Sequence, residues 1–206
     1  MHLSKYTLLF LLMLAPSVIL HEVSHGVVAL WFGDDTAKRA GRLTLNPLRH
    51  VDPFGTLILP AILLLAGLVP FGYAKPVPVN VSRLRRPRDH SLLVSLAGPA
   101  TNLVLCVIAT VIWRVFHPQG TAGELVIAAV YGNLLLAMFN MLPLPPLDGS
   151  AIVERLLPER YWPAWLNLRR YAMGLLLLAL LVAPARFSFS RIFSPVLQFW
   201  DQHFLV

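Results

Sequence analysis

The feature that most constrains this chain is a set of apolar runs long enough to cross a lipid bilayer. Crossing the hydrocarbon core takes about 20 consecutive apolar residues in a helix. Three runs are of about this length, Tyr6–Trp31, Ser91–Phe116 and Glu124–Leu142, and a fourth, Tyr171–Ala183, is shorter. Backbone polar groups in lipid need internal partners, so such segments are helices. The sequence therefore predicts an all-α polytopic membrane protein with about four transmembrane helices.

The composition agrees with a membrane protein. Hydrophobic residues make up 57% of the chain and charged residues 13%, against about 25% charged in ordinary soluble domains. Most of the 206 residues lie in apolar runs, so we expect one membrane-embedded domain, residues 1–206, in a lipid bilayer. The net charge is +7, but no basic run is interleaved with aromatic residues, so no nucleic-acid partner is expected. Residues 187–206 alternate aromatic and polar side chains and are expected to lie at the membrane interface.

The apolar stretch Thr56–Val69 is too short for a comfortable crossing and contains Pro60 and Gly67. A re-entrant segment therefore competes with a full crossing. Without a crossing here, 13 of the 17 Lys and Arg residues face one side of the membrane and 4 face the other; with a crossing, the division weakens to 10 and 7. Because basic loops stay in the cytoplasm, we expect a re-entrant segment and a cytoplasmic loop over residues 32–90.

Two histidines and a glutamate lie inside the first apolar run, as His21-Glu22-Val23-Ser24-His25. Positions i and i+4 share one face of a helix, so both imidazoles can bind the same metal ion, with Glu22 beside them. This set suits catalytic zinc, since the ion makes a bound water acidic and a carboxylate can take its proton. The alternative is that the two histidines share a helix face by chance. That alternative has to place ionisable groups in the bilayer, where a charge at the centre costs about 2.5–3.5 kcal/mol. We predict one Zn²⁺ per chain, with His21 and His25 as ligands and Glu22 as the catalytic base.

A catalytic zinc ion needs a third protein ligand. Asp148 follows the third run, where a cluster of prolines ends the helix and Gly149 permits an unusual turn. The alternative is that Asp148 caps a helix beginning near Ser150. The downstream carboxylates that could serve as the ligand are Glu124, Asp148, Glu154 and Glu159.

The histidine motif together with Asn140-x-x-Pro143-x-x-x-Leu147-Asp148-Gly149 resembles the motifs of the site-2 proteases, which are intramembrane zinc metalloproteases. The stretches GRLTLNPLRHVDPFGT, GYAKPVPVN and LAGPATN are similar to the compact prokaryotic branch, without PDZ or nucleotide-sensing domains. The resemblance implies that His21, His25 and Asp148 bind zinc and that Glu22 is the base. It also implies that Asn140 and Asn102 lie near the metal, where an amide could stabilise an oxyanion. Hydrogen bonding between membrane helices is an equally good interpretation of these two amides.

The loop after the first run contains two stretches, RLTLN and KPVPVN, that we expect to be extended and to form a small membrane-associated β-sheet. Pro76 and Pro78 lack an N–H on one edge, whereas Val77 and Val79 keep theirs on the other. A substrate could pair with that edge as an added strand, which makes Val77 and Val79 candidate substrate contacts. Equally, the prolines could only protect an edge against aggregation.

Together these features predict a zinc metalloendopeptidase that cuts single-pass membrane proteins in or near their transmembrane segments. We expect it in a prokaryotic plasma membrane, with the active site nearer the cytoplasmic face, and a homo-oligomer is compatible with the sequence. One alternative is a zinc-binding or transporting membrane protein, which would place ionisable groups along several helices. Another is a metalloprotease family that uses a glutamate as its third ligand.

Overall fold

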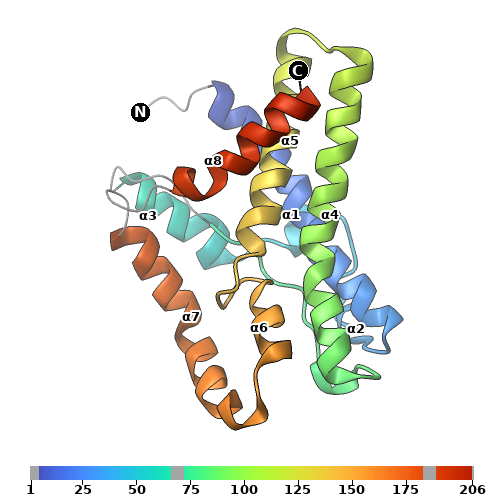
Figure 1. The fold of residues 1–206 in the computed structure, drawn as a ribbon, viewed down its shortest axis with the longest axis vertical. Coiled ribbons are helices and arrows are strands. Elements are labelled where there is room, and N and C mark those ends of the chain that lie inside the picture. The colour runs from blue at the N-terminus through green and yellow to red at the C-terminus, as the bar shows by residue number, and fades with distance from the viewer. Residues whose placement is uncertain (1–4, 66–71, 183–188, 206) are drawn as a thin grey trace. The chain divides into compact units, whose positions relative to one another are not determined.

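The computed structural model describes residues 5–65, 72–182 and 189–205, and these residues form helices joined by loops (Figure 1). The four long helices are α1 (Lys5–Trp31), α4 (Pro87–Phe116), α5 (Gly120–Asn140) and α7 (Trp162–Val182). The all-α fold class expected from the sequence is confirmed for the described residues. The shorter helical elements are α2 (Thr36–Arg39), η1 (Pro47–Arg49), η2 (Pro53–Ile58), α3 (Leu59–Leu65), η3 (Val81–Arg83), α6 (Ser150–Leu156), η4 (Glu159–Tyr161), α8 (Phe189–Trp200) and η5 (Asp201–Leu205).

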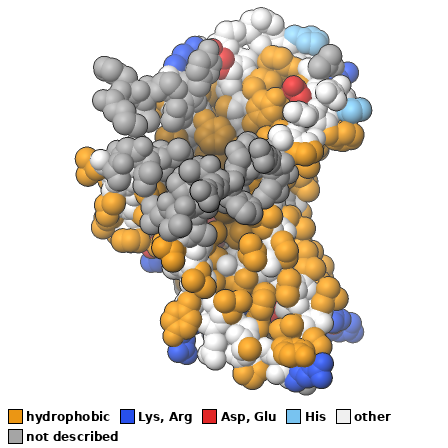
Figure 2. Space-filling model, turned by 60° about the vertical axis from the view of Figure 1, so that its left-hand side comes forward, with side chains coloured by type: hydrophobic (Ala, Val, Ile, Leu, Met, Phe, Trp, Pro, Cys, Tyr) orange, Lys and Arg blue, Asp and Glu red, His pale blue; other side chains and the backbone are white. Residues whose placement is uncertain are grey.

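Three of the described helices are long and apolar enough to cross a membrane: Leu8–Trp31 within α1, all of α4 and all of α5. Only 17% to 33% of the most apolar part of each helix is buried in the protein. Most of its side chains are therefore exposed on the protein surface, as expected for helices that contact lipid. Figure 2 shows hydrophobic side chains over much of one face. These helices indicate a multi-pass membrane protein.

The expected fourth span differs from the sequence prediction. Helix α7 begins at Trp162, nine residues before the predicted Tyr171, and it is not among the described helices that qualify as spans. Arg169 and Arg170 interrupt its apolar character. Beyond them, the apolar part up to Val182 rises about 18 Å, which is short of a bilayer core of about 30 Å.

The chain divides into two compact units. We call Leu14–Gly98 the histidine unit, and Met1–Met13 with Pro99–Val206 the aspartate unit. Helices α1 and α4 each contribute residues to both units.

The histidine unit has a small core beside the end of α1. Ala29, Leu84 and Val94 are buried there, and Val79 packs against them. The fully buried Asp34 ties the loops together, because one carboxylate oxygen accepts from the Thr36 amide (3.0 Å) and the other accepts from the Asn80 amide (2.6 Å). The end of α1 is therefore fixed to the segment that precedes α4.

Of the short apolar stretch Thr56–Val69, the described part up to Leu65 is helical, and residues 66–69 lie outside the described residues. The described part lies in η2 and α3, and the Asp52 carboxylate accepts from the amide of Gly55 at 2.7 Å in the first turn of η2. The amide of Tyr73 donates to the carbonyl of Gly55 at 3.1 Å. A stretch that crossed the bilayer once would have ends about 30 Å apart. The chain that leaves Gly55 has instead returned to it by Tyr73.

The described residues contain no β-strand, so the small sheet predicted for RLTLN and KPVPVN is not formed by them. The amides of the second stretch have partners in separate elements. Lys75 N–H donates to the carbonyl of His50 (2.9 Å), and Val77 N–H donates to Oε2 of Glu22 (2.9 Å). Pro76 and Pro78 supply no N–H, so too few donors remain for a regular ladder.

In the aspartate unit, α4 and α5 form a hairpin (Figure 1). Their buried contact consists of Cys106, Ala109, Val130 and Leu134. Trp200 at the end of α8 packs on this cluster and donates its indole N–H to Thr110 Oγ1 at 3.1 Å. With 12 residues, α8 is too short to cross a bilayer, as expected for this segment, while its placement at the membrane interface stays a prediction.

Candidate metal centre

Helix α1 places the two motif histidines on one face. Their ring centroids lie 4.8 Å apart with the ring planes at 84°, and both side chains are buried. This is the arrangement expected for residues one helical turn apart. The structure therefore brings His21 and His25 together as the sequence predicts.

The backbone of α4 orients the ring of His25. Nδ1 of His25 lies 2.7 Å from the carbonyl oxygen of Val94. A carbonyl can only accept, so Nδ1 carries the hydrogen and Nε2 has the lone pair that a metal ligand requires. A Cβ atom on Gly98 would lie 2.5 Å from Nε2 of both His21 and His25. The space beside the two Nε2 atoms is therefore kept clear by the missing side chain of Gly98.

Glu22 is half-buried next to the histidines, and a backbone amide holds its carboxylate. Oε2 of Glu22 accepts the N–H of Val77 at 2.9 Å. The loop comes this close to α1 because Gly26 has no side chain: a Cβ there would lie 2.9 Å from Cγ1 of Val77. The amide proposed from the sequence as a substrate contact is thus bonded to Glu22 in this structure. Val79 lies in the core beside Ala29, and a substrate contact by Val77 or Val79 stays a prediction.

Asp148 lies in a tight turn after α5. The amide of Gly149 donates back to the carbonyl of Asn140 at 2.6 Å. A Cβ atom on Gly149 would overlap the carbonyl oxygen of Met141, so this turn requires glycine. Helix α6 has Gly149 as its N-cap residue and no side-chain hydrogen bond at that cap. Asp148 therefore does not occupy the N-cap position of this helix.

The residues that could hold a metal ion are His21 and His25 of the histidine unit and Asp148 of the aspartate unit, with one ligand atom from each. Two imidazole nitrogens and a carboxylate oxygen are ligand types of catalytic zinc, and three protein ligands leave a fourth position open. The clear space beside the Nε2 atoms fits an ion bound there. The donor set of this chain thus fits zinc.

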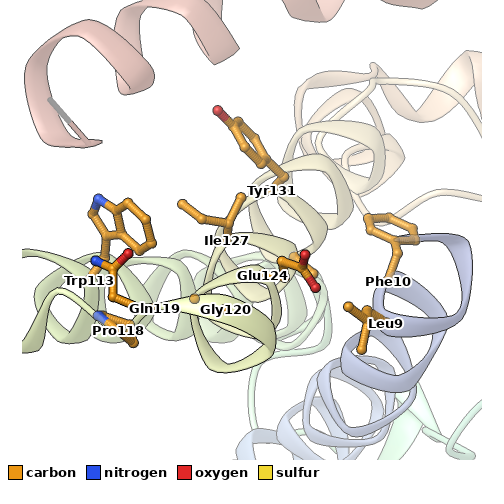
Figure 3. Close-up of a pocket in the computed structure, with 11 residues that line it drawn as sticks. Leu9, Phe10, Trp113, Pro118, Gln119, Gly120, Glu124, Ile127 and Tyr131 are labelled. Atoms are coloured by element: carbon orange, nitrogen blue, oxygen red, sulfur yellow. The ribbon is translucent and has the colours of Figure 1, made fainter. Parts of the chain in front are cut away.

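The other carboxylates considered as ligands have different surroundings. Glu124 forms an ion pair with Lys5 at 2.6 Å, in a pocket of about 490 Å³ within the aspartate unit (Figure 3). Glu154 forms an ion pair with Arg169 at 3.1 Å. The side chain of Glu159 lies outside the described residues. Glu124 and Glu154 are thus each engaged by a basic side chain.

Comparison with known proteins decides the family. Residues 9–121 match the family described as Peptidase family M50. The chain belongs to this family. Because M50 is the site-2 protease family, the resemblance noted in the sequence is confirmed, and the chain is a zinc metalloprotease of that family.

The relatives of this M50 protease come from bacteria and archaea, and the three described here each carry the printed name "Putative zinc metalloprotease". YwhC of Bacillus subtilis is 46% identical over 156 residues, which cover 70% of this chain and 67% of the relative. Rip2 of Mycolicibacterium smegmatis is 33% identical over 186 residues (88% and 70%). MJ0611 of Methanocaldococcus jannaschii is 30% identical over 146 residues (70% and 68%). No solved structure matches the chain.

The two asparagines expected near the metal, Asn102 and Asn140, form hydrogen bonds to helix residues in this M50 protease. Nδ2 of Asn102, which is fully buried in α4, donates to Oδ1 of Asn133 in α5 at 2.9 Å. Nδ2 of Asn140 donates to the carbonyl of Leu136 at 3.0 Å. The Asn102 contact matches the helix-to-helix alternative, and a role of either amide at an oxyanion stays a prediction.

Three participants in the site of this M50 protease were missed in the sequence: the Val94 carbonyl, the Gly98 position and the use of the Val77 amide by Glu22. Each of these positions approaches the histidine motif from a residue 55 or more positions away in the sequence. Val94 and Gly98 lie one turn apart on α4. The glycine in LAGPATN was the one available signal, since a glycine inside an apolar helix commonly marks a close approach.

Proposed function

We propose that this M50 protease hydrolyses peptide bonds in or next to transmembrane segments of single-pass membrane proteins. The observation that carries the proposal is that α1, a helix apolar enough to cross a membrane, holds two buried imidazoles with a carboxylate beside them. Ionisable groups at such a depth are costly unless they have a function. A peptide that reaches them has to enter the membrane, which favours transmembrane segments as substrates.

Asp148 is proposed as the third ligand of a single zinc ion, with His21 and His25. The turn that carries Asp148 depends on Gly149, and Gly149 rather than Asp148 is the N-cap residue of α6. Of the rival carboxylates, Glu124 and Glu154 have basic partners. On this proposal the histidine unit and the aspartate unit act together as one metalloprotease domain.

The residues of the chain have separate tasks in the reaction. When bound, zinc would supply a Lewis acid for a water molecule and for the substrate carbonyl. Glu22 accepts the proton of the attacking water and later donates it to the leaving amine. The Val77 amide holds Oε2 of Glu22, which leaves Oε1 to receive the proton. The bond from His25 to the Val94 carbonyl keeps that imidazole in the tautomer that presents Nε2.

The reaction is proposed to take place near the cytoplasmic face of a prokaryotic plasma membrane. His25 lies six residues before the end of α1 at Trp31, about 9 Å along the helix axis. The joined ends of the stretch between Gly55 and Tyr73 support a re-entrant segment. With that segment, 13 of the 17 Lys and Arg residues share a side with the end of α1, which is expected of a cytoplasmic surface.

The experiment compares Glu22→Gln, Asp148→Ala and wild type for zinc content and for cleavage of a single-pass membrane substrate in detergent. Glu22→Gln should keep its zinc and lose about 10²–10⁴ in rate, because it removes the base but no ligand. Asp148→Ala should bind zinc more weakly. Glu154→Gln is the matched control, since this carboxylate pairs with Arg169 and should change neither quantity.

The same experiment separates the alternatives. A Glu22→Gln protein that cleaves at the wild-type rate would favour a zinc-binding or transporting membrane protein. Undiminished zinc affinity in Asp148→Ala would keep the proteolysis and remove Asp148 from the ligand set.

A further inference from the structure

A groove of about 520 Å³ in the histidine unit carries three cationic side chains: Arg42, Arg49 and Lys75. None of the residues that line the groove is acidic. The remaining lining residues are apolar: Ala40, Leu48, Val51, Pro76 and Pro78.

Arg42 is the central observation. Its side chain is 8% exposed, and its Nη2 donates to the carbonyl oxygen of Lys75 at 2.7 Å. Nε is buried and has no hydrogen-bond partner among the described residues, and no described carboxylate forms an ion pair with this guanidinium. A buried cation without a counter-charge is costly, so an anion in the groove would stabilise it.

The groove is built before any ligand arrives. Lys75 is held from both sides, since its carbonyl accepts from Arg42 and its amide donates to the carbonyl of His50 at 2.9 Å. His50 in turn bonds through Nε2 to the carbonyl of Thr44 at 2.8 Å. Arg49 ends the short helix η1, whose first turn is capped by Asn46. A pre-formed site loses less entropy when it binds a ligand.

Apolar side chains next to the cations indicate a membrane surface. Leu48 lines the groove and is 78% exposed, and Leu45 in the same loop is 63% exposed. The apolar helix α3 begins ten residues after Arg49 and also exposes large side chains, among them Ile62 and Leu65. Exposed apolar residues beside cations are typical of a surface that lies at the boundary between lipid headgroups and acyl chains.

We propose that this groove binds the phosphate group of an anionic phospholipid, with the acyl chains along Leu45, Leu48 and the exposed side of α3. Guanidinium groups form paired hydrogen bonds to phosphate oxygens, and two arginines with a lysine match a phosphate that carries negative charge. The cytoplasmic leaflet, where the charge distribution places this loop, is the leaflet rich in anionic lipids. The proposal does not depend on proteolytic activity.

The test is native mass spectrometry of the full chain in detergent, titrated with phosphatidylglycerol or with phosphatidylcholine of the same acyl chains. Arg49 and Lys75 are exposed, so Arg49→Gln/Lys75→Gln should fold. Each cation near an anionic lipid is worth about fivefold in binding, so the double variant should bind phosphatidylglycerol about 30-fold more weakly. Lys38→Gln/Arg86→Gln is the matched control, since it removes the same charge from exposed positions outside the groove and should bind as wild type does.

Arg42→Gln adds a second measurement. It should abolish the preference for phosphatidylglycerol over phosphatidylcholine, and its unfolding temperature without lipid reports whether the chain still folds. Equal losses in the groove variant and the control would mean general surface charge and would overturn the site. Full competition by millimolar inorganic phosphate would assign the groove to free phosphate rather than lipid. Binding of an acidic peptide without any lipid preference would assign it to a protein partner, and either result would overturn the proposal.

Discussion

Gly98→Ala is predicted to disrupt the zinc site without removing any ligand. The new Cβ atom would lie 2.5 Å from Cε1 and Nε2 of His21 and from Nε2 of His25. Ordinary contacts of this kind are about 3.5–4.0 Å, so the overlap is about 1 Å with two rings at once. His25 cannot retreat freely because its Nδ1 is bonded to the Val94 carbonyl.

The expected loss of zinc affinity follows from how little the metal–ligand distances can vary. Ligand distances are held within about 0.2 Å, and a displacement of about 1 Å exceeds that several times over. Overpacking in a buried site costs about 1–3 kcal/mol. If that cost falls on the metal-bound state, zinc affinity drops by about 5- to 150-fold.

The assay is competition for zinc between the protein and a chelator, with thermal unfolding of the metal-free protein measured in parallel. Gly174→Ala is the matched control, because Gly174 also lies in a long helix and its Cβ position has no atom within 4 Å. Both variants gain the helix propensity of alanine, so a difference between them reports the contact with the histidines. Wild-type zinc affinity in Gly98→Ala would refute the view that Gly98 keeps the ligand space clear.

Three further predictions concern the surroundings of the site. Val77→Pro removes the N–H that Glu22 accepts, and cleavage should fall about 10-fold or more with zinc content unchanged; full activity would show that this amide does not position the base. Gly149→Ala should lower zinc retention, since its Cβ would overlap the Met141 carbonyl and move the turn; an unchanged chelator titration would contradict this. Ser82→Cys in a Cys106→Ala background should react with a membrane-impermeant thiol reagent from the cytoplasmic side, and labelling from outside would exclude the re-entrant topology.

Periodic, strongly apolar segments were predictable from the sequence. The first run was predicted as Tyr6–Trp31 and is observed as Lys5–Trp31, and the second was predicted as Ser91–Phe116 and is observed as Pro87–Phe116. Length and hydropathy decide these helices, and both are local properties. The side-by-side placement of His21 and His25 followed from the helical period for the same reason.

Features that depend on contacts distant in sequence were not predictable in this way. The alternating pattern of KPVPVN was interpreted as a strand, but its donors bond to His50 and Glu22, which no local pattern reveals. The bond from His25 to Val94 joins residues 69 positions apart. Helix α7 was predicted too short because Arg169 and Arg170 lower the hydropathy, although charge does not prevent a helix outside lipid.

The hydrogen-bonding pattern of residues 76–78 has a consequence for inhibitor chemistry. Two of these three residues are prolines, and the single remaining N–H, that of Val77, is accepted by Glu22. A ligand laid along this stretch would therefore meet carbonyl oxygens and no backbone donor. Peptide-like inhibitors aimed at it should keep their own N–H groups, and N-methylation on the facing side should weaken them more than replacement of their carbonyls.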